Sequence, residues 1–418
     1  GAGGKPVVTA PRRRRTIALA ILGALAVVGA YALARTGSLG RFTSAPPGAN
    51  PPATIRSIAV LPLDNYSGDS TQEYFAEGMT DELTAALATI SQLRVTSRGS
   101  AMQFHGRSRP STPEIAKRLD VDAVVEGSVS RAGNKVRITA QLIDARADRH
   151  LWAKSFERNS SDVLALQAEL ASAIAREINV RLTEQEQSRL ATAPSVNPEA
   201  HDAYLRGRYF FNRPTDENLR KAIAQFEESV RLSPTFALGY SGLSDAYAWA
   251  GYNEGFMTAS EAKPRTKATA EKAVQLDDNS AEAHTSLAMF KLYYDFDWVG
   301  CEREFRRAIE LNPNYAYAYD QFGLALAFTG RFDESIMESR RAAQLDPLSP
   351  QVLVDAANAP MFQKNFPAAR ELNREAAELD PTYFFSFMAE GWNDLDAGQF
   401  HEAIPLIKKA TTMGAPPF

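Results

Sequence analysis

The sequence predicts an α/β domain followed by an all-α superhelical solenoid, with one transmembrane helix before both. In the second half, short segments that end in proline return every 34 residues, at Pro313, Pro347 and Pro381. The middle of the chain alternates strand-like and helix-like patterns, and a charge-free stretch of 19 residues lies near the N-terminus. A period of 34 residues is the length of one helix–turn–helix unit of a stacked solenoid.

The composition narrows the class of protein. The chain has 418 residues, of which 44% are hydrophobic, so two or three domains with a substantial core are expected. A net charge of −4 argues against a general nucleic-acid surface. The single cysteine, Cys301, excludes an intrachain disulfide.

Residues 1–15 are predicted to be a cytoplasmic basic linker and residues 16–34 a transmembrane helix. The uncharged stretch would be roughly 28 Å long as a helix, about the thickness of a bilayer core. Four arginines, Arg12 to Arg15, precede it directly, and the positive-inside rule places them in the cytoplasm. The rest would then be extracytoplasmic, on the periplasmic side of a cell inner membrane. The alternative is a signal peptide cleaved after the A-x-A site that ends at Ala34.

The chain begins with glycine and has no early methionine. We therefore expect it to be a piece of a longer protein or a processed product.

Residues 35–54, rich in proline, glycine and serine, are predicted to be a flexible spacer. Residues 55–190 follow as one compact α/β domain with the order β-α-β-α-β-β-β-α. Its first strand, Ile55–Leu63, is apolar, and two later strands are joined by a turn at Ala132–Asn134. Alternating apolar and polar side chains in the second of these strands predict one buried face and one solvated face.

Three helices are predicted in this domain. The first lies within the segment Phe75–Leu93 and starts after a turn at Gly78–Asp81. The second opens at Thr112. The third is a long amphipathic helix over Asp162–Leu190.

Residues 197–418 are predicted to form the solenoid, with five to six units. When the units are aligned on their prolines, one position in the second helix holds a small residue in five of them, as expected where helices touch closely. These residues are Ala222, Cys301, Ser335, Ala369 and Ala403.

The small-residue position, the apolar first helix and the terminal proline resemble the tetratricopeptide repeat (TPR) over about half the chain. The segments SIAVLPLDNYSGDSTQEYFAEGMTDELTAAL and VDAVVEGSVSRAGNKVRITAQLIDARADRHLWAKSFER are similar to the TolB amino-terminal-like domain. The resemblance implies a bacterial membrane-anchored receptor. Relatives of this layout carry a serine/threonine kinase, an adenylate cyclase or a winged-helix DNA-binding domain before the membrane helix.

Motifs of known catalytic chemistry are missing from the sequence. It contains no phosphate-binding glycine loop, nucleophile elbow or kinase motif, and none of the five histidines has zinc-ligand spacing. We therefore expect no enzyme, no cofactor and no metal in this chain. The polar loop Asp64–Ser70 is interpreted as a turn rather than a ligand loop. Asp120 and Asp122 are interpreted as a helix-to-strand connection rather than a cation site.

A row of aromatic residues provides the candidate binding site. Trp249, Tyr294, Phe328 and Phe362 fall at the thirteenth place of four consecutive units, late in the first helix. In the tetratricopeptide family, first-helix side chains off the core stripe line a concave groove, where aromatic residues would suit apolar or proline-containing peptides. The alternative is packing between neighbouring units. Two secondary candidates on the same side are Tyr317 and Phe290.

These features predict a non-catalytic, membrane-anchored extracytoplasmic protein that binds proteins or peptides as a scaffold or sensor. One alternative is the C-terminal sensory part of a signalling protein whose kinase, cyclase or DNA-binding domain precedes residue 1. Another is a secreted periplasmic adaptor released after Ala34.

Overall fold

The computed structural model describes most of the chain after residue 54. The described ranges are 55–106, 109–191, 196–213, 215–252 and 256–413, with residues 1, 3 and 4. The predicted transmembrane helix (16–34) and spacer (35–54) lie outside them. In these ranges no helix is both long and apolar enough to cross a bilayer. The described residues from Ile55 onward pack as one compact unit.

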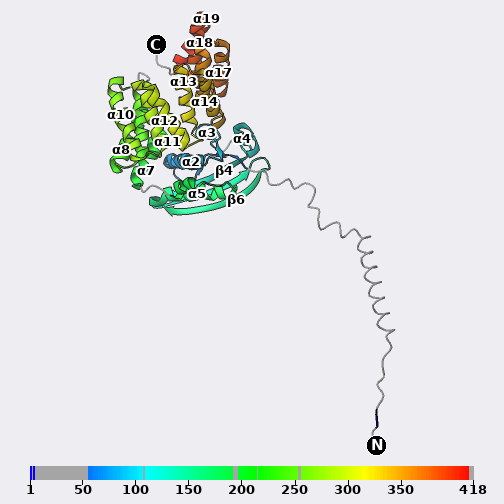
Figure 1. Ribbon diagram of the computed structural model, residues 1–418. Helices are drawn as coiled ribbons and strands as arrows, with labels where there is room; N and C mark the ends of the chain where they lie inside the picture. Colours follow the sequence, from blue (N-terminus) through cyan, green and yellow to red (C-terminus); the bar gives the residue numbers. More distant parts are fainter. Residues whose placement is uncertain are drawn as a thin grey trace. The chain divides into compact units, whose positions relative to one another are not determined.

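A six-stranded sheet forms the centre of the first part of this unit (Figure 1). Its order is β3-β1-β4-β5-β6, with β2 also paired to β4. Strand β1 is parallel to β3 and β4, whereas β4, β5 and β6 form an antiparallel meander. The strands are β1 (Ser57–Val60), β2 (Asp64–Asn65), β3 (Arg94–Val95), β4 (Ala123–Ala132), β5 (Lys135–Asp144) and β6 (Arg149–Asn159).

Both faces of β1 are buried because helices lie on each side of it. Ile58 and Val60 point into the larger core with α2 (Glu73–Ala88) and α5 (Val163–Glu177). Ala59 and Leu61 point the other way, against α4 (Thr112–Leu119). This alternation explains why Ile58 to Leu61 are all apolar. Shorter elements are η2 (Ser70–Gln72), α3 (Arg98–Met102) and η3 (Ser160–Asp162).

Two helix predictions in this part are wrong in detail. The Gly78–Asp81 segment is helical, inside α2, rather than a turn. Its glycine is needed for close packing, because a Cβ at Gly78 would lie 2.8 Å from the side chain of Leu205 in the solenoid. The predicted long helix 162–190 is two helices, since α5 ends at Glu177 and α6 begins at Glu184. Asn179, with φ of 57°, takes the left-handed conformation between them.

The second part of the unit is a solenoid of stacked helix pairs (Figure 1, green to red). Six antiparallel pairs are present in the described residues, with α15 and α16 together serving as one first helix. The helices are α7 (Pro198–Phe211), α8 (Asp216–Leu232), α9 (Ala237–Tyr252), α10 (Ala259–Leu276), α11 (Ala281–Phe290), α12 (Trp298–Leu311), α13 (Ala316–Phe328), α14 (Phe332–Leu345), α15 (Pro350–Ala356), α16 (Asn358–Phe362), α17 (Phe366–Leu379), α18 (Phe384–Asp396) and α19 (Phe400–Thr412). Helix α11 continues into one π-helical turn, η4 (Lys291–Asp295).

Small residues let the helices of a pair approach each other. All five residues at the repeated small position are buried: Ala222, Cys301, Ser335, Ala369 and Ala403. Glycines have the same role around Phe226, because a Cβ at Gly207 or Gly242 would lie 2.5 or 2.6 Å from its ring. The repeated spacing therefore reflects helix contact, and the helical solenoid predicted from it is confirmed.

The loop that carries the repeated Pro313 docks on the sheet-containing part. The next residue, Asn314, is 5% exposed. Its Nδ2 donates hydrogen bonds to the backbone oxygens of Ala88 (2.9 Å) and Leu93 (2.8 Å). Its Oδ1 accepts a hydrogen bond from the amide of Val95 at 3.3 Å. One side chain thus joins the solenoid to the end of α2 and to β3.

The loop that carries Pro347 docks in a similar way, one unit further on. The Asp346 carboxylate accepts hydrogen bonds from the amide of Ser100 (2.8 Å) and its hydroxyl (2.5 Å). The amide of Leu348 donates to the Ser100 hydroxyl at 2.8 Å, and the amide of Ser97 donates to the oxygen of Leu345 at 2.7 Å. Two consecutive inter-pair loops are therefore fixed to the α/β part.

Candidate functional site

The inner side chains of the later helix pairs line a groove of about 650 Å³, here called the aromatic groove. It extends from α9 through η4, α13 and α15 to α18. Its aromatic and apolar lining is Trp249, Met289, Tyr293, Tyr294, Tyr317, Leu324, Phe328, Val354, Met361, Tyr383, Phe385, Met388 and Trp392. Its polar lining is Gln321, Gln351, Asp355, Asn358 and Asn373. A long apolar groove with few polar groups is typical of sites that bind an extended ligand.

The structure brings together four of the six aromatic residues predicted from the sequence. Trp249, Tyr294, Tyr317 and Phe328 all line the aromatic groove. The ring of Phe362 lies beside that of Phe328, with centroids 5.9 Å apart. Phe362 is 41% exposed and Phe328 is 42% exposed. These two rings are available to a partner.

Phe290 is placed differently from the other five. It is 1% exposed and belongs to a small core with Ala262, Ala270 and Tyr294. Its ring stacks on that of Tyr294 at 6.3 Å. Packing between units, the alternative considered for the aromatic row, describes Phe290 and also the row residue Tyr294, which is 8% exposed in the same core.

Tyr294 has both a packing face and a groove face. Its hydroxyl donates a hydrogen bond to the backbone oxygen of Ala248 at 2.8 Å. Burial raises the pKa of Tyr294 to about 12, so the hydroxyl stays a donor at any physiological pH. This bond fixes the ring in the wall of the groove.

The sequence reasoning missed the polar side chains of the groove, although the repeat contains a signal for them. Ser286, Gln321 and Asp355 stand 35 and then 34 residues apart, so they occupy the same place in three successive units. In the structure Gln321 contacts Asp355, with Nε2 3.2 Å from Oδ2. The Ser286 hydroxyl donates to Asp245 at 2.7 Å. A ladder of polar residues therefore runs along the first helices beside the aromatic row.

The Asp355 carboxyl of this ladder lies next to a second carboxyl, that of Asp320. Gln321 Nε2 donates to Asp320 at 3.0 Å as well as to Asp355. Burial, reinforced by the neighbouring Asp355, raises the pKa of Asp320 well above its ordinary value. Burial also raises the pKa of Asp355 to about 6. Both groups are held in an environment that disfavours their charged form.

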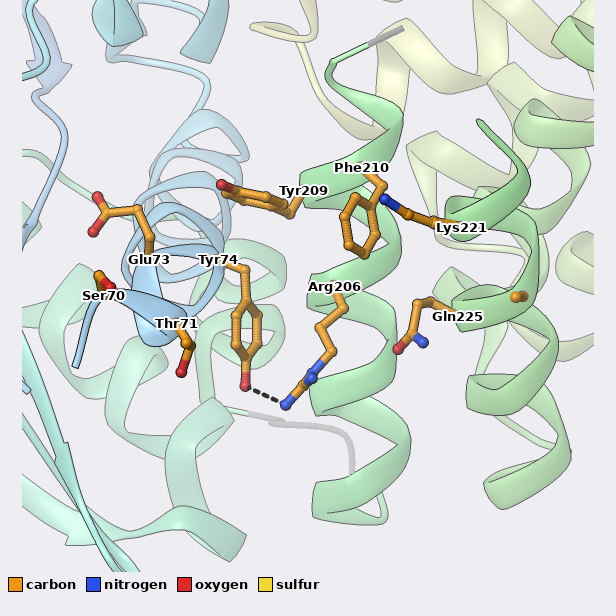
Figure 2. A pocket seen from close by; sticks show the side chains of 10 residues that line it. Ser70, Thr71, Glu73, Tyr74, Arg206, Tyr209, Phe210, Lys221 and Gln225 are labelled. Atoms are coloured by element: carbon orange, nitrogen blue, oxygen red, sulfur yellow. Dashed lines mark hydrogen bonds between the residues drawn. The ribbon is translucent and has the colours of Figure 1, made fainter. Parts of the chain in front are cut away.

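A second hollow, of about 450 Å³, lies between the start of α2 and helices α7 and α8 (Figure 2). Its cations already have partners. Arg206 donates to the Tyr74 hydroxyl at 3.2 Å and pairs with Asp202 at 3.1 Å, and Lys221 pairs with Glu217 at 2.6 Å. Because these charges are satisfied within the chain, the hollow offers less to a charged ligand than the aromatic groove does.

Other sequence candidates have structural roles. Asn65 and Asp69 bond within their own loop, from Asn65 Nδ2 to the Asp69 oxygen at 2.9 Å, as the turn interpretation predicts. Asp120 ends α4 in a left-handed conformation, and Asp122 accepts a hydrogen bond from the amide of Arg56 at 2.8 Å. Burial raises the pKa of the Cys301 thiol to about 12, so this cysteine is a core residue rather than a nucleophile. Within the described ranges, no group of three or more metal-ligating side chains could hold an ion.

The 34-residue period and the stacked helix pairs define a solenoid of the tetratricopeptide type, joined to a domain with a mixed sheet. No family model matches the chain, so the resemblance of the α/β part to the TolB amino-terminal domain stays a prediction. One curated relative, "Putative adenylate cyclase 3" from Rhizobium meliloti (strain 1021), is 33% identical over 233 residues. Those residues are 56% of this chain but only 40% of that relative's length.

Three solved structures similar to this chain have low sequence identity to it. YrrB, described as a TPR protein with an unusual peptide-binding site, is 21% identical with a TM-score of 0.30, covering 45% of this chain and 92% of its own. TTC0263, a TPR protein of Thermus thermophilus, is 13% identical with a TM-score of 0.39, covering 51% and 98%. The human IFIT1 dimer with m7Gppp-AAAA is 17% identical with a TM-score of 0.44, covering 59% and 58%.

Proposed function

We propose that this chain is a non-catalytic scaffold or sensor that binds an extended protein or peptide segment in the aromatic groove. The observation that carries the proposal is the groove itself, about 650 Å³ in volume and lined by aromatic, Met and Leu side chains from successive first helices. Aromatic side chains give large contact area and lose little rotamer freedom on binding. The Asp355 carboxyl in the groove lining disfavours a nucleic-acid ligand, because its charged form would repel the phosphates.

A selection of displayed random peptides on the full chain tests this proposal. Phe328 is 42% exposed in the groove, whereas Phe400, at 61%, lies on α19 outside it. Phe328→Ala and Phe400→Ala are therefore matched changes inside and outside the site. Truncating an aromatic anchor costs ~1–2 kcal/mol of binding, which is roughly a 5- to 30-fold loss of affinity.

Selected peptides should bind the wild-type chain and Phe400→Ala alike, and bind Phe328→Ala at least fivefold more weakly. Circular dichroism melts should be the same for all three proteins. Peptides that bind Phe328→Ala as well as the wild type would place the binding site elsewhere, and a selection without enrichment would remove the proposal.

The location of this scaffold is a second part of the proposal. We infer that residues 16–34 anchor the chain in a bacterial inner membrane and that the solenoid is extracytoplasmic. The charge-free stretch behind four arginines supports this orientation. An alkaline phosphatase fusion after Met413 should be active if the orientation is right and inactive if the solenoid is cytoplasmic.

The relative named as an adenylate cyclase favours a second candidate function. We propose that the chain is the sensory part of a signalling protein whose effector domain precedes residue 1. The identity of 33% over 233 residues supports it. Reading the gene upstream of Gly1 tests it: an encoded cyclase, kinase or winged-helix domain supports a one-protein signalling device, whereas a start codon within a few residues removes the effector.

A further inference from the structure

Two adjacent carboxyls at the aromatic groove have no positive partner within the chain. In the described ranges, neither Asp320 nor Asp355 forms an ion pair with a lysine, arginine or histidine. The two carboxyls are hydrogen-bonded to each other, and their other donors are neutral amides: Gln321 Nε2 serves both, and Gln351 Nε2 lies 3.5 Å from Asp355. Asp320 is 2% exposed.

Several other buried acids of this chain have a cationic partner. Glu304 pairs with Lys291 at 3.1 Å and with His284 at 2.8 Å, and Glu77 pairs with Arg213 at 2.6 Å. Buried acids in folded proteins are normally paired in this way, because an unpaired buried charge is costly. In the described ranges no lysine, arginine or histidine pairs with the two carboxyls of the groove, and Asp355 lines the open groove, where a ligand can supply a cation.

An independent feature of the same groove also lacks a donor. Asn373, on α17, lines the aromatic groove and is 1% exposed. Its side-chain oxygen Oδ1 has no hydrogen-bond donor within the chain. Buried polar atoms are satisfied in the great majority of cases, so this oxygen is open to an N–H donor from a ligand in the groove.

We propose that the aromatic groove selects a peptide segment with one lysine or arginine side chain between apolar residues. The cation lies on Asp355, with Asp320 behind it, and Asn373 accepts a further N–H. The apolar flanks lie on Trp249 and Phe328. A segment fits better than a free amine because the apolar lining extends over several helix pairs, far beyond the reach of one ammonium group. This inference rests on the proposed peptide-binding function and adds the charge of the ligand.

The test uses degenerate nonapeptide pools and the full-length chain. Every pool has flanks drawn from Leu, Met, Phe, Pro, Ala and Ser. The central residue is Arg or Lys in two pools and Gln, norleucine or Glu in three others. Binding is measured by fluorescence polarisation on wild type, Asp355→Asn, Phe328→Ala and the control Asp333→Asn, which removes an exposed carboxylate of α14 outside the groove.

The Arg and Lys pools should bind the wild type at least tenfold more tightly than the Gln and norleucine pools, and the Glu pool should bind most weakly. Asp355→Asn should abolish the preference while Asp333→Asn keeps it. Phe328→Ala should weaken every pool. Equal binding of charged and neutral pools that is still lost in Phe328→Ala would overturn the charge selectivity alone. Binding of no pool would overturn the peptide-binding function together with this inference.

Free arginine amide and butylamine are measured as competitors in the same assay. Competition only at concentrations far above those of the peptides supports a peptide ligand. Full displacement at peptide-like concentrations would overturn the peptide part of the proposal and make the groove an amine site.

Discussion

Replacing Asn314 by alanine should uncouple the solenoid from the α/β part. The side chain makes two short hydrogen bonds, to the oxygens of Ala88 and Leu93, and two longer ones, to Ile90 and from Val95. Each net hydrogen bond contributes ~1 kcal/mol, and buried groups left without a partner add to the loss. We therefore expect Asn314→Ala to lower the free energy of unfolding by ~2–4 kcal/mol.

The repeat supplies a matched control for this change. Asn279 stands at the same place one unit earlier, but it is exposed and contacts only its own unit and Arg307. Asn279→Ala should change the stability by less than ~0.5 kcal/mol, as most surface substitutions do.

Two measurements on the full chain check the reasoning. Guanidinium unfolding gives the free energies, and hydrogen–deuterium exchange reports on the amide of Val95, which donates to Asn314. That amide should exchange faster in Asn314→Ala and stay protected in Asn279→Ala. Asn314→Asp should be at least as destabilising, because it replaces the donating amide group by a carboxylate oxygen. That oxygen would face the backbone oxygens of Ala88, Ile90 and Leu93 without a hydrogen to share. If both alanine variants had the same stability and the same protection at Val95, the loop would not hold the two parts together.

Three further measurements test other sites. The pKa of Asp355 is about 6 against 3.8 for an ordinary carboxyl, so stability falls as pH rises between these values. Asp355→Asn should raise the unfolding free energy by ~1–3 kcal/mol at neutral pH and by nothing near pH 4, in urea titrations at both pH values. Burial opposes the charging of His284, but Glu304 outweighs it and raises its pKa, so their pair stabilises below about pH 6.5 and fades at higher pH. His284→Gln should therefore lose ~1 kcal/mol at pH 6 and less at pH 9, and an equal loss at both would contradict the pairing. Gly242→Ala should lower the stability by ~1–3 kcal/mol in thermal melts, because its Cβ would meet Phe226, and an unchanged melt would refute that contact.

The sequence predicted the helix pairs well because one physical cause, close helix contact, returns in every unit. It could not predict the contact between solenoid and sheet, since Asn279 and Asn314 occupy the same place and only one of them meets a second domain. The break at Asn179 was also hidden, because the apolar pattern runs on through it.

The aromatic groove was predictable in part for the same reason. Repeat position predicted the row of Trp249, Tyr294 and Phe328, because equivalent places in a solenoid face the same way. Phe290 was predicted to lie on the same side of the solenoid as this row. The repeat position does not say how deeply a side chain is buried, and the Phe290 ring is stacked on that of Tyr294 inside the core. Asp355 escaped notice because a single acid in a helix predicts a solvated face unless its neighbours in space are known.

The two docked loops have a mechanical consequence. A helical solenoid is flexible along its axis, because each helix pair contacts only its neighbours. Here the turns around Asn314 and Asp346 are fixed to the α/β part, and Leu379 at the end of α17 packs on the same part, whereas α18 packs on α15, α17 and α19. The aromatic groove spans both regions, from Tyr317 on the fixed side to Met388 in α18. A ligand that contacted both ends of the groove would couple α18 to the helix pairs that are held by the sheet.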